Sequence, residues 1–198
     1  IEWFTNKLHS LIYKIENTGD GDYYRSGEHA FIKELGSLYK DKPFTVFDVG
    51  ANKGEYTSIL LETHPLEITV HAFEPQQSCV SLLNQLFLGK KNIVINPFGL
   101  SDTNSTSTLF KDVEDSGFAS VYQRNMEYYD IHLNKTEEIR LQTGLEYVTK
   151  NNISHIDLLK IDVEGHEEKV FAGFGDFLNP DNIDFIQFEY GGANLDSH

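Results

Sequence analysis

The sequence has one cysteine, five prolines and no long hydrophobic run. Because an internal disulfide needs two cysteines, Cys79 alone excludes a disulfide-stapled fold and agrees with a reducing compartment. We interpret Cys79 as a small buried hydrophobic residue. No stretch approaches the roughly 18 apolar residues of a membrane-spanning helix, and no signal peptide opens the sequence. These absences predict a cytoplasmic protein without a membrane span.

Basic residues are also scarce. Sixteen Lys and Arg stand against 31 Asp and Glu, which gives a formal net charge of −15. A general nucleic-acid binder needs clustered Lys and Arg to contact phosphates, so we expect no nucleic-acid partner. The acidic excess fits an enzyme that acts on neutral substrates or carries a cationic cofactor.

The 198 residues suffice for one domain with a real core. Apolar residues at helical spacing predict an amphipathic helix, followed by a turn, within residues 1–26. Its apolar face either covers the domain or meets another chain, which makes it a candidate homo-oligomer contact. We assign residues 27–198 to the main domain. The chain begins at Ile1 rather than Met, and we expect a trimmed sequence with a truncated C-terminus.

The middle of the chain alternates between strand and helix patterns. Strands are expected at 44–49, 68–73, 92–97, 156–161 and 183–190, and helices at 28–39, 55–63, 77–88, 144–151 and 167–174. This alternation predicts an α/β fold with a parallel sheet covered on both faces. Residues 103–143 break the pattern. Two antiparallel strands there, 106–110 and 138–141, flank an aromatic stretch that we expect to cross the ligand face as an insert.

The most informative motif is Val46-Phe47-Asp48-Val49-Gly50-Ala51-Asn52-Lys53-Gly54, followed later by Phe73-Glu74-Pro75. A glycine turn after one strand and an acid after the next is how an α/β protein holds an adenosine-containing ligand. Every expected strand end also carries or precedes a carboxylate: Asp48, Glu74, Asp102, Asp162 with Glu164, and Glu189. Since buried acids are costly without partners, a cationic or hydroxyl-rich ligand would account for them.

Three interpretations of this motif remain: a dinucleotide site, an S-adenosylmethionine site, and a structural glycine turn that binds no cofactor. A dinucleotide needs its pyrophosphate on a Gly-x-Gly-x-x-Gly turn, and here the first close pair of glycines is missing. Asp48 would repel a pyrophosphate but attract the ammonium and sulfonium charges of S-adenosylmethionine. At ~4 Å and an effective dielectric near 20, such a pairing is on the order of 4 kcal/mol before desolvation. We therefore favour S-adenosylmethionine.

Four blocks together resemble the FkbM family of S-adenosylmethionine-dependent methyltransferases. They are Phe47–Thr57, Ala72-Phe73-Glu74-Pro75, Leu100-Ser101-Asp102 and Leu159-Lys160-Ile161-Asp162-Val163-Glu164-Gly165-His166-Glu167. The last block narrows the match to this family, and the resemblance covers about residues 27–190. It implies a Rossmann-like class I methyltransferase sheet and transfer of a methyl group to a hydroxyl of a sugar, glycan or secondary metabolite. The family's sheet usually ends in an antiparallel hairpin, which we expect this chain to lack.

The resemblance also implies which residues bind the cofactor. Asp48, Gly50, Ala51, Asn52 and Gly54 would hold its methionine end, with Tyr56 and Thr57 closing the loop from above. Glu74 would bind the ribose diol, Pro75 would shape the adenine slot, and Ser101 and Asp102 would reach the adenine edge.

Methyl transfer is an in-line displacement that needs an aligned acceptor oxygen and a base for its proton. The base candidates are Asp162, Glu164, Glu189 and His166, although His166 could instead open a helix on the solvent side. Lys160 shares a face with Asp162, and we expect it to neutralise nearby acids. Asp162, Glu164 and Glu189 could also offer oxygens to Mg²⁺. The alternatives are a nicotinamide-dependent sugar oxidoreductase or epimerase, and a non-catalytic binding module of the same fold.

Overall fold

The computed structural model describes residues 27–39, 42–63, 68–124, 126 and 130–189, and every statement below concerns these residues. The amphipathic helix expected within residues 1–26 lies outside them. Within the described part, no helix combines the length and the hydrophobicity that crossing a membrane requires.

The centre of the molecule is a five-stranded sheet in which every neighbouring pair is parallel. Its order is β3 (Ile93–Asn96), β2 (Ile68–Phe73), β1 (Phe44–Val49), β7 (Ile156–Ile161) and β8 (Ile183–Phe188). β1 and β7 are almost wholly buried, because both are mainly apolar and helices cover the sheet on both sides. The predicted α/β class and parallel sheet are confirmed.

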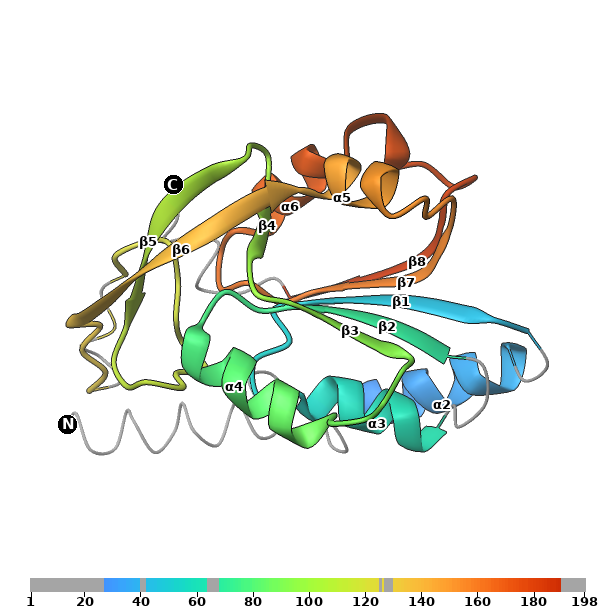
Figure 1. Ribbon diagram of the computed structural model, residues 1–198, viewed down its shortest axis with the longest axis horizontal. Coiled ribbons are helices and arrows are strands. Elements are labelled where there is room, and N and C mark those ends of the chain that lie inside the picture. The colour runs from blue at the N-terminus through green and yellow to red at the C-terminus, as the bar shows by residue number, and fades with distance from the viewer. Residues whose placement is uncertain (1–26, 40–41, 64–67, 125, 127–129, 190–198) are drawn as a thin grey trace, which may run out of the picture.

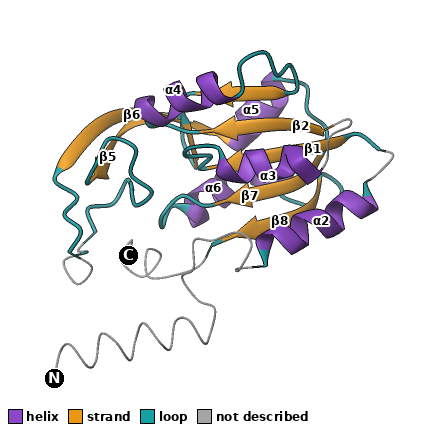
Figure 2. Cartoon of the chain, turned by 90° about the horizontal axis from the view of Figure 1, so that it is seen from below, coloured by secondary structure: helices purple, strands orange, loops and turns teal. Residues whose placement is uncertain are grey.

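Helices cover both faces of this sheet (Figures 1 and 2). On one face lie α2 (Glu28–Leu38), α3 (Glu55–Thr63) and α4 (Gln77–Leu86). On the other lie α5 (Gly144–Lys150), α6 (Glu167–Phe174) and the short 3₁₀ helix η2 (Gly175–Phe177). The bounds of α3 and α6 are those predicted, whereas α4 ends two residues earlier than expected.

The core below α5 and α6 is aromatic. Phe47 and Phe73 of neighbouring strands have ring centroids 5.1 Å apart, and Tyr147 packs edge-on against Phe73 at 4.8 Å. Phe174 closes the cluster from α6. Burying each ring stabilises the fold by about 1.5–3 kcal/mol. This cluster holds the two helices firmly against the strands that carry the site.

A smaller sheet extends from one end of the molecule (Figure 1). Its order is β4 (Gly99–Ser101), β6 (Lys135–Thr143) and β5 (Ser105–Lys111), with β5 and β6 antiparallel as predicted. The sequence did not predict β4, because three residues are too few to show a periodicity. Gly173 of α6 packs directly on β4: a Cβ atom there would lie 1.9 Å from the carbonyl oxygen of Ser101.

Residue Glu189 follows β8 directly, and residues 190–198 lie outside the described part. The absence of the family's terminal hairpin therefore remains a prediction. So does the domain boundary after residue 26.

Candidate functional site

The loop after β1 makes the tight turn that its glycines predict. Gly50 has φ +80°, and the backbone amides of Gly50 and Ala51 both donate to the carbonyl oxygen of Phe73, each at 3.0 Å. A Cβ atom on Gly50 would lie only 1.8 Å from the carbonyl oxygen of Asp162. Glycine at this position therefore lets the loops that follow β1 and β7 touch.

Asp48 lies under this loop rather than on its outer surface. Its side chain is fully buried, and Lys160 Nζ lies 3.1 Å from Asp48 Oδ1. Thr57 donates to Asp48 Oδ2 at 2.7 Å, and Lys160 also donates to the Gly50 carbonyl oxygen at 3.0 Å. The expectation that the Asp48 charge faces the ligand therefore does not match this arrangement. Lys160 already neutralises that charge, because the two residues are paired across the parallel strands.

Tyr56 and Thr57 likewise lie at the base of the loop and do not close it from above. Both are buried, and the Tyr56 hydroxyl donates to Gln187 Oε1 at 2.5 Å. Lys160 Nζ lies 5.3 Å from the centre of the Tyr56 ring. Lys160 thus also neutralises acids, as expected: Asp162 Oδ2 is 3.7 Å from the same nitrogen.

Glu74, at the tip of β2, has both carboxylate oxygens engaged. Oε2 accepts from the backbone amide of Asn52 at 2.9 Å, and Oε1 accepts from that of Gln76 at 2.7 Å. The residue is only 4 % exposed. Burial raises its pKa to about 7, although the two amide hydrogen bonds act in the opposite direction. Pro75 is half-buried beside it.

Residues 112–124, which we call the strap, run from the end of β5 across the carboxyl edge of the main sheet. On one side the Ser116 carbonyl oxygen accepts from Asn52 Nδ2 at 3.3 Å and from Gln76 Nε2 at 3.0 Å. Lys53 and Asp115 form an ion pair at 2.9 Å. These contacts attach the strap to the loop after β1 and to the start of α4.

The other side of the strap reaches the loop after β7. Ser120 Oγ donates to the carbonyl oxygen of Glu164 at 2.8 Å, and Arg124 Nη1 lies 2.6 Å from Glu164 Oε2. The Tyr122 hydroxyl is 3.0 Å from His166 Nδ1. The strap therefore spans the loops that follow β1 and β7, at the edge of the sheet where we expect the ligand to bind. Of the aromatic residues of the insert, Tyr128 and Tyr129 lie outside the described part.

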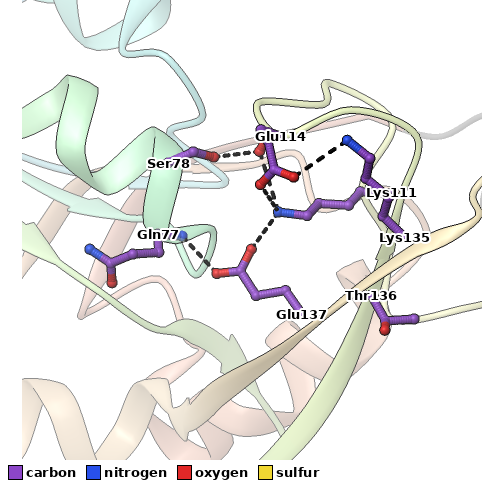
Figure 3. A pocket seen from close by; sticks show the side chains of 7 residues that line it. All are labelled: Gln77, Ser78, Lys111, Glu114, Lys135, Thr136 and Glu137. Atoms are coloured by element: carbon purple, nitrogen blue, oxygen red, sulfur yellow. Dashed lines mark hydrogen bonds and ion pairs between the residues drawn. The ribbon is translucent and has the colours of Figure 1, made fainter.

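A groove between α4 and the β5–β6 pair is lined by paired charges (Figure 3). Lys111 Nζ lies 2.6 Å from Glu137 Oε2 and 3.1 Å from Glu114 Oε2. Glu137 also accepts from the backbone amide of Gln77 at 2.9 Å. Because these charges pair with one another and Glu137 also bonds the first residue of α4, they fasten the small sheet to that helix.

Ser101 and Asp102 are brought together with α6. Ser101 Oγ is 2.9 Å from His166 Nε2, and Asp102 Oδ2 is 2.9 Å from Lys169 Nζ. His166 thus bridges β4 and the strap rather than facing solvent. Burial lowers its pKa, so its ring is neutral at neutral pH. A neutral imidazole held at both nitrogens is well placed to position Tyr122.

Asp162, Glu164 and Glu189 converge as the sequence predicts, with a carboxylate oxygen of each within 4.8 Å of the others. Partial burial and the charges of Asp162 and Glu164 raise the pKa of Glu189 to about 7. Burial and Asp162 also raise the pKa of Glu164, against the opposing effect of Arg124. Three oxygens of this kind match the ligand preference of Mg²⁺.

Sequence reasoning missed three residues of the site: Gln76, Ser116 and Arg124. Gln76 contacts Ser116, and Arg124 contacts Glu164. Each of these contacts joins residues that are 40 positions apart in the sequence. Only the position of Gln76, two residues after Glu74, gave a usable signal.

A family model described as "Methyltransferase FkbM domain" matches residues 48–197. No curated protein sequence gives a significant match. The similar solved structures include a methyltransferase FkbM from Methylobacillus flagellatus KT, with 14 % identity over 77 % of this chain and a TM-score of 0.45. This chain covers 37 % of that one.

Two further structures are similar at the same level. The plantazolicin methyltransferase BpumL, solved with a monoazolic desmethylPZN analog and SAH, has 11 % identity, a TM-score of 0.44 and coverage of 92 % of this chain and 51 % of its own. A putative caffeoyl-CoA O-methyltransferase from Staphylococcus aureus also has 11 % identity and a TM-score of 0.44, with coverage of 91 % of this chain and 73 % of its own. Because the family model matches well over half of the sequence, this chain belongs to the FkbM methyltransferase family.

Proposed function

We propose that the chain is an S-adenosylmethionine-dependent O-methyltransferase acting on a hydroxyl of a sugar, glycan or secondary metabolite. One observation carries the proposal. A buried carboxylate at the tip of β2 and a carboxylate cluster beyond β7 and β8 lie on the same edge of the sheet, and both adjoin one strap. That arrangement would suit a nucleoside site beside an acid-rich acceptor site.

The donor side fits the cofactor chemically. Glu74 offers a carboxylate that can accept from the two hydroxyls of a ribose, and its position is fixed by Asn52 and Gln76. When bound, S-adenosylmethionine supplies the electrophilic methyl group. Gly50, Ala51, Asn52 and Gly54 would shape the slot for its methionine end, while Asp48, Tyr56 and Thr57 would support that loop from below. Pro75, Ser101 and Asp102 would border the adenine.

On the acceptor side we favour Glu189 as the base. Asp162 has Lys160 nearby and Glu164 is paired with Arg124. Among the described residues no cation pairs with Glu189, which directly follows β8. Its carboxylate would take the hydroxyl proton as the oxygen attacks the methyl carbon, while the strap orients the acceptor. His166 would act by positioning Tyr122.

Mg²⁺ is the alternative to base catalysis on this side. Asp162, Glu164 and Glu189 would then hold the ion, which would polarise the acceptor hydroxyl, and Glu189 would be a metal ligand instead of the base. A screen with radiolabelled S-adenosylmethionine on glycans and small metabolites, with and without EDTA, would identify the acceptor and test the metal requirement. Mass spectrometry of the labelled product would establish whether the methyl group is on oxygen.

We expect Glu74→Ala to weaken binding of S-adenosylhomocysteine by about 10- to 150-fold, because hydrogen bonds to a charged group are worth about 1.5–3 kcal/mol. Isothermal titration calorimetry measures the change. Glu138→Ala is the matched control, since it removes the same charge from an exposed position on β6. Unchanged affinity in Glu74→Ala would contradict our placement of the ribose. Binding of NAD would favour an oxidoreductase, and binding of neither ligand a scaffold.

We also expect affinity for S-adenosylhomocysteine to rise with pH between about 6 and 8. Burial raises the pKa of Glu74 to about 7, so the carboxyl holds a proton below that pH and must lose it to accept from both ribose hydroxyls. One proton limits the slope to at most about tenfold per pH unit. Calorimetry at several pH values tests this. The Glu74→Gln variant should show no such slope, and a slope that persists in it would rule out Glu74 as the cause.

A further inference from the structure

Asn52 and Gln76 each connect Glu74 with the strap. The two backbone amides that donate to Glu74 belong to Asn52 and Gln76, at 2.9 Å and 2.7 Å. The side-chain amides of the same two residues donate to one carbonyl oxygen, that of Ser116, at 3.3 Å and 3.0 Å. Any group that binds at Glu74 therefore lies next to residues that hold the strap.

Gln76 has a polar atom that these contacts leave unused. The side chain must present its nitrogen to Ser116, because a carbonyl oxygen only accepts hydrogen bonds, and this fixes the orientation of the amide. Its Oε1 then points elsewhere, and no described residue donates to it. Gln76 is only 3 % exposed. A buried acceptor without a donor destabilises the fold, so a site that keeps one implies a missing partner.

We propose that Gln76 is a further ligand-binding residue of the donor site. Its Oε1 accepts a hydrogen bond from an O–H or N–H group of the bound nucleoside, while its Nε2 holds Ser116. One side chain thus contacts both the nucleoside and the strap, so binding of the donor stabilises the strap over the site. The proposal rests on the proposed function, since it takes the nucleoside to be that of S-adenosylmethionine.

Calorimetry with S-adenosylhomocysteine tests the first half. Gln76→Met keeps the length of the side chain but removes both hydrogen-bonding groups, and we expect it to weaken binding by about tenfold. Gln77→Met is the matched control, because Gln77 is the exposed next residue and its contact to Glu137 uses only the backbone. We expect Gln77→Met to bind like the unchanged protein. Affinity of Gln76→Met within twofold of the unchanged protein would overturn the proposal.

Hydrogen exchange tests the second half, and its first measurement uses the unchanged protein, so that measurement does not depend on whether a variant folds. Adding S-adenosylhomocysteine should slow amide exchange in residues 112–120, and Gln76→Met should lose most of that slowing. If S-adenosylhomocysteine binds and exchange there does not change, the coupling to the strap is wrong while the proposed function stands. If the unchanged protein does not bind it at all, the proposed function fails first.

Discussion

Replacing Lys160 by Met is expected to destabilise the fold by about 3–5 kcal/mol, the cost of leaving one partner of a buried ion pair alone. Lys160 is 5 % exposed and its partner Asp48 is fully buried, with 3.1 Å between Nζ and Oδ1. Methionine fills much of the same space, so the loss comes mainly from the charge. Urea unfolding followed by circular dichroism measures the change in the free energy of unfolding.

The double variant Asp48→Asn/Lys160→Met tests whether the unpaired charge causes the loss of stability. It removes both charges, and asparagine can still accept from Thr57, so we expect it to recover much of the lost stability. If the double variant is no more stable than Lys160→Met, packing rather than charge explains the loss. A single variant within 1 kcal/mol of the unchanged protein would show that the ion pair has little importance for folding.

Replacing Gly50 by Ala is expected to cost about 2–5 kcal/mol and to abolish S-adenosylhomocysteine binding. A left-handed φ of +80° costs a non-glycine residue about 1–2 kcal/mol. The new Cβ atom would also lie 1.8 Å from the Asp162 carbonyl oxygen, and forcing a methyl group into a packed site adds about 1–3 kcal/mol. Urea unfolding and calorimetry measure the two effects.

Gly89→Ala separates the cost of a positive φ from the cost of the steric clash. Gly89 has nearly the same φ, +81°, but a Cβ atom there would meet nothing within 4 Å. We therefore expect this variant to lose only about 1–2 kcal/mol and to bind S-adenosylhomocysteine normally. Equal losses in the two variants would mean that the contact between the loops after β1 and β7 does not matter.

The sequence predicted the main sheet well because its strands are apolar runs bounded by turn residues. The bounds of β1, β2 and β7 agree with the expected ones. It also placed Glu74 and the three converging acids, since the carboxyl ends of parallel strands share one edge. These predictions depend only on local patterns and on topology.

The parts that failed depend on contacts between distant residues. Asp48 could not be recognised as buried under the loop, because its partner Lys160 follows 112 residues later and the strand order decides that they meet. The strap contacts of Ser116 and Arg124 depend on how the insert folds back over the sheet. No periodicity in one sequence reports that.

The strap has a consequence for the rate of the reaction. It is held on both flanks, by Asn52 and Gln76 on one side and by Glu164 on the other, and Glu74 beneath is nearly inaccessible. With S-adenosylmethionine bound at Glu74 as we propose, the spent cofactor would leave only after some of these bonds break, and they would form again around its replacement. Product exit, rather than the displacement itself, would then set the pace of repeated cycles.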